Sequence, residues 1–303
     1  MSISEKIPLP ATEEANSRFH GIDSWRSSSV LDAMWEGQLA AVAAVRPALS
    51  AIESAADASV LRLIAGGRLV YAGAGTSGRI GVQDGAELSP TFNWPSARLV
   101  LLMAGGEAAL IRAVENAEDD AAAGACAIAD HDIGKHDVVI GIAASGSTKF
   151  TLACLQEANA RGACTIAVAN SADGAILRVA AHPILVETGA EVIAGSTRMK
   201  AGTAQKVVLN LLSSLIMVRM GRVHDGLMVD MVATNEKLRR RAERMLQQIT
   251  GVSLAQAAEA LGLSGGRVKT AAVVLEGLGA AEAEAVLAQH GGSLRAALAA
   301  LRS

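Results

Sequence analysis

The sequence predicts an α/β protein: a three-layer sandwich with helices on both faces of a five-stranded parallel sheet, plus a small C-terminal all-helical subdomain. Three observations lead to this class. Short apolar runs alternate with helical patterns up to about residue 196, no strand pattern follows, and the tail from residue 251 is rich in alanine and interrupted by glycines. Strands that alternate with helices build parallel sheets through right-handed crossovers.

The composition fits such a core and excludes some partners. Of the 303 residues, 51% are apolar and 2% aromatic, so we expect a core of aliphatic side chains. A formal net charge of −3 offers no field for nucleic acid or a membrane surface. Cys126, Cys154 and Cys164 show no metal-ligand spacing and indicate reduced thiols in a cytoplasmic protein without a metal. The N-terminus shows no export signal pattern.

The expected elements follow in order along the chain. A long helical pattern covers Ser29–Ala56. The expected strands are Arg68–Ala72, Arg98–Met103, Asp137–Gly141, Thr165–Val168 and Pro183–Val186. The helices between and after them are expected at Ser77–Ala86, Glu107–Gly124, Lys149–Arg161, Ala172–Ala180, Met199–Met220 and Leu227–Thr250. The alternation of the two patterns is what predicts crossovers on both faces.

These elements suggest four parts. Residues 1–56 form an N-terminal segment and long helix, and residues 57–225 form the sheet domain. Residues 226–250 form a connecting helix, and residues 251–303 form a helical subdomain of three or four short helices. The apolar stretch at 207–218 is too short to span a bilayer, so we expect a buried helix there.

Two similar loops follow the first and third expected strands. They read YAGAGTSG at 71–78 and GIAASGST at 141–148. Backbone N–H groups of a glycine-rich turn, a helix N-terminus and hydroxyl side chains together bind phosphate. Parallel strands deliver such loops to one crevice. The expected phosphate-binding residues are Gly75, Thr76, Ser77, Ser145, Gly146, Ser147 and Thr148. The alternative is that each loop is only a tight, capped strand-to-helix turn.

The first loop also matches a dinucleotide-binding pattern, which we reject. Gly73, Gly75 and Gly78 fit G-x-G-x-x-G after a strand. That fingerprint requires an acidic residue at the end of the next strand, but residues 101–104 read LLMA.

Carboxylates near these loops are candidates for acid–base chemistry. Glu87 follows the first loop, while Glu115, Glu118 and two aspartates lie in the expected helix after the second strand. Spacing alone does not choose between Glu115 and Glu118, and a solvated helix face is the alternative for each.

A third segment, EVIAGSTRMKAGTAQK at 191–206, places a Gly-Ser-Thr cap and lysines at a helix start. Cations near a helix N-terminus oppose its dipole, so they suggest anion binding or pairing with Glu191. We therefore include Ser196, Thr197 and Lys200 among the candidate substrate contacts. An ordinary capped helix is the alternative.

Together with LMVDMVATNEKL at 227–238 and Thr12-Glu13…Asn16 near the start, these segments resemble the N-acetylmuramic acid 6-phosphate etherases over nearly the whole chain. The resemblance implies a sugar-isomerase (SIS) fold, a cytoplasmic homodimer and no metal or organic cofactor. It implies cleavage of N-acetylmuramic acid 6-phosphate to N-acetylglucosamine 6-phosphate and D-lactate, in the recycling of cell-wall sugars. By the family's mechanism, Glu118 takes the C2 proton of the open-chain sugar and Glu87 protonates the leaving lactyl oxygen.

The chain departs from the family pattern in both loops. It has Glu87-Leu88-Ser89-Pro90-Thr91 where the family commonly has Glu-Cys-Pro-Pro-Thr, and Ser147 where the family commonly has arginine. These changes bear on substrate affinity and on the C3 substituent. The alternatives are an aldose–ketose phosphosugar isomerase, which needs no acid for a C3 leaving group, and a non-catalytic sugar-phosphate sensor like the vertebrate glucokinase regulatory protein.

Overall fold

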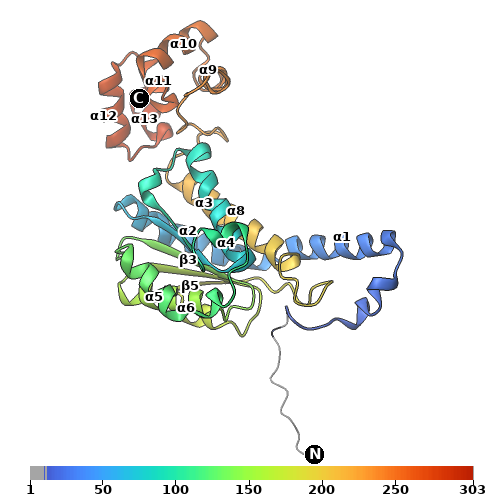
Figure 1. The fold of residues 1–303 in the computed structure, drawn as a ribbon. Coiled ribbons are helices and arrows are strands. Elements are labelled where there is room, and N and C mark those ends of the chain that lie inside the picture. Colours follow the sequence, from blue (N-terminus) through green and yellow to red (C-terminus); the bar gives the residue numbers. More distant parts are fainter. Residues whose placement is uncertain (1–9, 11, 303) are drawn as a thin grey trace, which may run out of the picture. The chain divides into compact units, whose positions relative to one another are not determined.

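In the computed structural model, which describes residues 10 and 12–302, one five-stranded parallel sheet has the strand order β2-β1-β3-β4-β5 (Figure 1). The strands are β1 (Leu69–Gly73), β2 (Leu99–Met103), β3 (Val138–Ala143), β4 (Cys164–Ala169) and β5 (His182–Leu185). All five predicted strands are therefore confirmed, with ends that differ by at most two residues.

The strand order creates a switch point between β1 and β3. Tyr71 of β1 pairs in register with Leu101 of β2 on one side and Ile140 of β3 on the other. The sheet grows from β1 towards β2 in one direction and from β3 towards β4 and β5 in the other. In open α/β sheets, ligands bind beyond the carboxyl ends of the strands at such a point.

Helices cover both faces of the sheet (Figure 1). One face carries α5 (Ala121–Asp130), α6 (Lys149–Ala160) and α7 (Ala175–Val179), and the other carries α2 (Leu49–Ile64), α3 (Gly75–Phe92) and α8 (Lys200–Arg219). Consecutive β3 residues Val138, Val139 and Ile140 are fully buried. A strand buried on both faces reads as a continuous apolar run rather than as an alternating one, which is why the strands were visible in the sequence.

The prediction of one long helix over Ser29–Ala56 is wrong. It is two helices, α1 (Ser27–Ala43) and α2, with a 3₁₀ turn at Arg46–Ala48 between them. Pro47 lies inside that turn. Proline lacks the N–H of a helical hydrogen bond and clashes with the preceding turn, so the first helix ends before it.

The helix predicted over Glu107–Gly124 is also wrong. Only α4 (Ala108–Ile111) and then α5 are α-helical, and a 3₁₀ turn at Ala117–Asp119 lies between them. Asn116, at φ +62°, precedes this turn. Its left-handed backbone, which asparagine tolerates better than most residues, ends any continuous helix.

The chain forms two compact units. The sheet unit comprises the residues up to 85 together with 97–213, and the helical unit comprises 86–96 together with the residues from 214 on. The helical unit contains α9 (Glu236–Thr250), α10 (Leu254–Leu263), α11 (Val268–Val274), α12 (Ala280–Gln289) and α13 (Leu294–Arg302). Four short helices thus follow residue 251.

The helix predicted over Leu227–Thr250 starts late, because only α9 is helical. Asn235 caps α9 by accepting a hydrogen bond from the Leu238 N–H at 2.9 Å, an ordinary N-terminal signal. The residues 226–250 that were expected to connect two domains lie within the helical unit, where Ala242 and Leu246 are fully buried in its core.

By length and composition alone, the stretch Ser27–Ile64 and helix α8 are long and apolar enough to cross a membrane. Core helices pass the same test. Val208, Leu209 and Leu212 of α8 are fully buried, in agreement with the buried helix predicted for 207–218.

Candidate functional site

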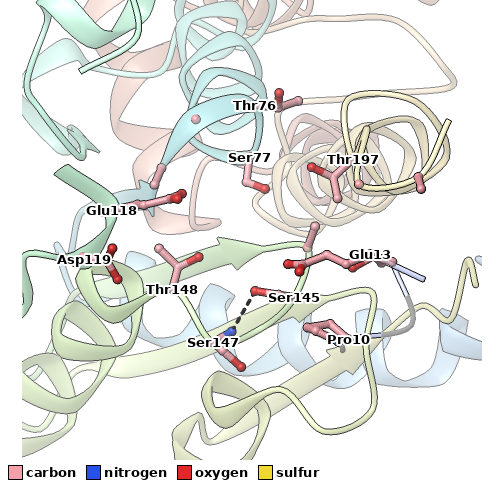
Figure 2. Close-up of a pocket in the computed structure, with 16 residues that line it drawn as sticks. Pro10, Glu13, Thr76, Ser77, Glu118, Asp119, Ser145, Ser147, Thr148 and Thr197 are labelled. Atoms are coloured by element: carbon pink, nitrogen blue, oxygen red, sulfur yellow. Dashed lines mark hydrogen bonds between the residues drawn. The ribbon is translucent and has the colours of Figure 1, made fainter. Parts of the chain in front are cut away.

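A pocket with a volume of about 720 Å³ opens in the sheet unit at the carboxyl ends of β1 and β3 (Figure 2). We call it the switch-point pocket. It is lined by Pro10, Thr12, Glu13, Ala74, Gly75, Thr76, Ser77, Glu118, Asp119, Ala144, Ser145, Ser147, Thr148, Ala194, Gly195 and Thr197. Both Ser/Thr loops expected from the sequence therefore meet in one place, as the switch-point topology predicts.

The first loop starts helix α3 at the pocket wall. Gly75 has φ +53°, a conformation that glycine adopts without strain. The first N–H groups of a helix have no partner within it and carry partial positive charge. Gly75, Thr76 and Ser77 contribute such groups, together with two hydroxyls, to the pocket. This is the arrangement expected of an anion site.

The G-x-G-x-x-G pattern has a packing reason. A Cβ on Gly78 would approach the Gly73 carbonyl oxygen to 2.7 Å and Met103 Sδ to 2.4 Å. Glycine at both positions lets helix α3 start directly against its own strand. The pattern therefore has a packing role, since it allows a close strand–helix crossing.

The second loop turns sharply from β3 into α6. Gly146, at φ +71°, packs so tightly that a Cβ would lie 2.5 Å from Gly174 Cα. The Ser147 N–H donates to Ser145 Oγ at 3.2 Å (Figure 2). Ser145, Ser147 and Thr148 line the pocket, whereas Gly146 does not. Gly146 shapes the turn that aims its neighbours.

The third segment behaves differently. Thr197 and Gly195 line the pocket, but Ser196 and Lys200 do not. The Glu191 carboxylate, 1% exposed, accepts the backbone N–H groups of Lys200 and Ala201, each at 2.9 Å. The chain's own carboxylate thus occupies the N-terminus of α8.

Lys200 is turned away from anion binding as well. Its Nζ donates to the Ala190 carbonyl oxygen at 2.9 Å. Burial lowers the pKa of Lys200, and the nearby Glu191 charge offsets part of that effect. Of the two functions that the sequence left open for this cation, the geometry favours the local one beside Glu191.

Glu118 and Glu115 are separated by the 3₁₀ turn. Glu118 lines the switch-point pocket, and Glu115 does not. Arg79 of α3 holds the preceding segment, donating from Nη2 to the Ala109 carbonyl oxygen at 2.7 Å. Glu115 lines a smaller pocket of about 210 Å³, to which Glu118 also contributes. Of the two glutamates between which spacing did not choose, only Glu118 lines the switch-point pocket, and Figure 2 shows it beside Asp119 and Thr148.

Glu87 is exposed and is not among the lining residues. It lies in the part of α3 that belongs to the helical unit, whereas the residues that line the pocket belong to the sheet unit. Asp84, one turn earlier, is 2% exposed and accepts hydrogen bonds from Tyr71 Oη at 2.9 Å and Asn210 Nδ2 at 2.6 Å. Burial, together with the Asp84 charge, holds the pKa of Tyr71 well above its usual value.

Sequence reasoning missed the N-terminal wall of the pocket. Pro10, Thr12 and Glu13 line it, although Thr12-Glu13 had been noted only as part of a resemblance. No periodicity predicts that an irregular segment folds over a distant loop. The one available signal was its recurrence in a family pattern.

Among residues 10 and 12–302, no group of three or more His, Cys, Asp or Glu side chains is arranged to hold a metal ion. Two thiols are buried, and Cys126 is exposed. Burial raises the pKa of Cys154 to about 12, so its thiol stays protonated. The residues that line the switch-point pocket include the carboxylates of Glu13, Glu118 and Asp119 but no Lys, Arg or His, so the groups there that can hold an anion are the N–H groups of helix N-termini and the hydroxyls.

Comparison with protein families supports the SIS fold. Residues 51–159 match the glucokinase regulatory protein N-terminal SIS domain, and residues 110–215 match the SIS domain. Among solved structures, a phosphoheptose isomerase from Francisella tularensis is 23% identical with a TM-score of 0.48, covering 64% of this chain and 100% of that one.

Curated proteins are similar over nearly the whole length. An N-acetylmuramic acid 6-phosphate etherase of Deinococcus radiodurans is 48% identical, covering 95% of this chain and 94% of the relative. Proteins of the same name are 43% identical in Halalkalibacterium halodurans, covering 95% and 97%, and 40% identical in Streptomyces avermitilis, covering 99% and 96%.

Proposed function

The chain belongs to the N-acetylmuramic acid 6-phosphate etherase family, and we propose that the switch-point pocket is where it carries out this reaction. The substrate is N-acetylmuramic acid 6-phosphate, and the products are N-acetylglucosamine 6-phosphate and D-lactate. One observation carries the assignment of the site: the carboxylate of Glu118 shares a pocket with the N-termini of α3 and α6.

The two helix N-termini hold the phosphate. The hydroxyls of Thr76, Ser77, Ser145 and Thr148 add donors around the backbone N–H groups. A dianion is well matched to such a cradle, because the helix dipoles place positive charge there without a basic side chain. Fixing the phosphate at C6 also fixes C2 and C3 of the sugar relative to Glu118.

Glu118 acts as the general base. In the open-chain aldehyde, the carbonyl at C1 acidifies the C2 proton, and Glu118 takes it. The electron pair forms the C2–C3 double bond as the C3–O bond to lactate breaks. Water then adds its hydroxyl to C3 and a proton returns to C2, giving N-acetylglucosamine 6-phosphate. Proton transfer by a positioned side chain is worth roughly 10²–10⁴-fold in rate.

Glu87 protonates the leaving lactyl oxygen, by analogy with the family. A general acid must come within hydrogen-bond reach of that oxygen. Mixing Glu87→Gln chains with Glu118→Gln chains tests whether Glu87 acts in the pocket of its own chain or in that of a second copy: activity regained on mixing indicates a site shared between copies.

An apolar stripe on α1 favours association with a second copy of the chain. Leu31, Trp35, Leu39 and Val42 follow each other at helical spacing and are 65%, 64%, 52% and 49% exposed. Contiguous exposed apolar surface of this kind marks association sites. We assign it to a homodimer that works in the cytoplasm. Light scattering that gives the mass of one chain at micromolar concentration contradicts the dimer, and Trp35→Glu should weaken it.

The test of the function is D-lactate release by the purified protein. N-acetylmuramic acid 6-phosphate should yield D-lactate, and unphosphorylated N-acetylmuramic acid should yield far less, because the phosphate cradle then has nothing to hold. Equal release from both sugars contradicts the phosphate cradle. No release from either contradicts the etherase function.

A further inference from the structure

The N-terminal segment forms one wall of the switch-point pocket. A turn closes it, with the Glu13 N–H donating to the Pro10 carbonyl oxygen at 2.8 Å. Thr12 and Glu13 both line the pocket. Figure 2 shows the Glu13 side chain near Ser145 and Thr197, on the side of the pocket opposite Glu118. No step of the proposed reaction uses this wall.

Thr12 carries an unsatisfied polar group. Its residue is fully buried, at 0% exposure, yet its Oγ1 has no hydrogen-bond partner within the part of the chain that the structure describes. Leaving a buried hydroxyl unpaired costs free energy, and nearly all such groups in folded proteins are paired. A hydroxyl that is both buried and on a pocket wall points to a partner that enters with the ligand.

Glu13 has the complementary chemistry for a sugar. An ionised carboxylate only accepts hydrogen bonds, whereas the hydroxyls and helix N-termini elsewhere in the pocket can donate to a phosphate. Of the other two lining carboxylates, Asp119 is paired with Lys149 at 3.2 Å, and Glu118 is assigned to the C2 proton. Glu13 is the carboxylate left to accept from hydroxyl and amide groups.

We propose that Glu13 and Thr12 are specificity-determining residues that bind the hydroxyl and amide donors of the open-chain amino sugar. This inference rests on the proposed function. The Glu13 charge repels a phosphate or a lactyl carboxylate placed against it, so the wall also orients the substrate with its anionic groups elsewhere. A site built to bind hydroxyl donors rejects analogues that lack them, because its own polar groups are then left unpaired.

The test compares two probes by calorimetry. Glu13→Ala should weaken binding of N-acetylglucosamine 6-phosphate about 10- to 100-fold, the loss typical of a hydrogen bond to a charged group. It should leave inorganic phosphate binding unchanged or tighter, because phosphate has no sugar donors and a repelling charge is gone. The control is Glu14→Ala, since Glu14 is exposed and does not line the pocket.

Thr12→Val separates a binding role from a structural one. Valine has the shape of threonine without the unpaired hydroxyl, so the melting temperature should stay equal or rise while sugar phosphate binding weakens several-fold. A purely structural threonine predicts the reverse: a lower melting temperature and unchanged binding.

Two results overturn the proposal. One is unchanged sugar phosphate binding in both variants, and the other is an equal loss for sugar phosphate and inorganic phosphate in Glu13→Ala. D-lactate release by the unaltered protein is measured in parallel. If lactate is released but the variants bind normally, only the assignment of this wall fails. If no lactate is released, the proposed function itself fails.

Discussion

The N-termini of helices α3 and α8 have the same backbone chemistry and opposite uses. At α3, the first turn faces the switch-point pocket with the N–H groups and hydroxyls of Thr76 and Ser77. At α8, the buried carboxylate of Glu191 takes the N–H groups of Lys200 and Ala201. A helix N-terminus therefore becomes a ligand site only where the protein does not supply its own anion, and the flanking residues decide which case applies.

The largest expected effect on activity is at Glu118, the carboxylate that shares the switch-point pocket with the N-terminus of α3. Glu118→Gln should lower the rate of D-lactate release by about 10²–10⁴-fold, since an amide cannot take the C2 proton. Glu115→Gln is the matched control, because Glu115 lies three residues away and does not line the switch-point pocket. Equal losses in the two variants contradict the assignment.

The N-terminus of α8, which Glu191 occupies, should matter for stability rather than for catalysis. Glu191→Ala removes the acceptor of two buried N–H groups and the charge that opposes the helix dipole. We expect the free energy of unfolding to fall by about 3 kcal/mol, measured by urea titration. Glu187→Ala, on the same connection but exposed, should change it little. A stable Glu191→Ala variant indicates that another group caps α8.

The hydroxyls of Ser145, in the switch-point pocket, and of Ser196, near the start of α8, should differ in their effect on KM. Ser145→Ala removes a donor from the pocket and should raise KM roughly tenfold, the cost of a hydrogen bond to a charged group. Ser196→Ala should not, because Ser196 does not line the pocket. The measurement is steady-state kinetics on both variants. A larger change in KM for Ser196→Ala than for Ser145→Ala would contradict this assignment.

The smallest effect concerns pH, away from both N-termini. Burial alone raises the pKa of Asp137, but hydrogen bonds from Arg68 and the N–H of Gly134 outweigh it and hold the pKa below its usual value. A lowered carboxyl pKa gives stability that is present above the unfolded pKa near 3.8 and is lost as pH falls through the folded value.

The measurement is the melting temperature as a function of pH. It should drop below about pH 4 in the unaltered protein, with a shallower drop in Arg68→Gln. The ion pair joins Arg68 Nη2 and Asp137 Oδ2 at 2.8 Å. If the melting temperature falls with pH identically in the two proteins, this ion pair is not a source of the acid sensitivity.

Much of the sheet unit could be predicted from the sequence, because buried strands and Ser/Thr loops leave local patterns. The position of Glu118 could be predicted only from a family pattern, since a left-handed Asn116 interrupts the expected helix. Pro47, which divides the first helix, was a readable signal that the prediction did not use.

The capping of α8 could not be predicted. Glu191 reaches the helix start from nine residues upstream through a loop whose path no periodicity encodes. The wall formed by Thr12 and Glu13 is hidden for the same reason. Long-range contacts made by irregular segments depend on the tertiary fold, not on local spacing.

The most direct test of the central claim is an amide nitrogen–proton NMR titration with N-acetylglucosamine 6-phosphate. If the pocket holds the phosphate on open helix N-termini, the N–H signals of Gly75, Thr76 and Ser77 should shift together with that of Thr148 at the start of α6. Those of Lys200 and Ala201, already bonded to Glu191, should stay in place. Shifts at Lys200 and Ala201 with none at residues 75–77 would contradict the account.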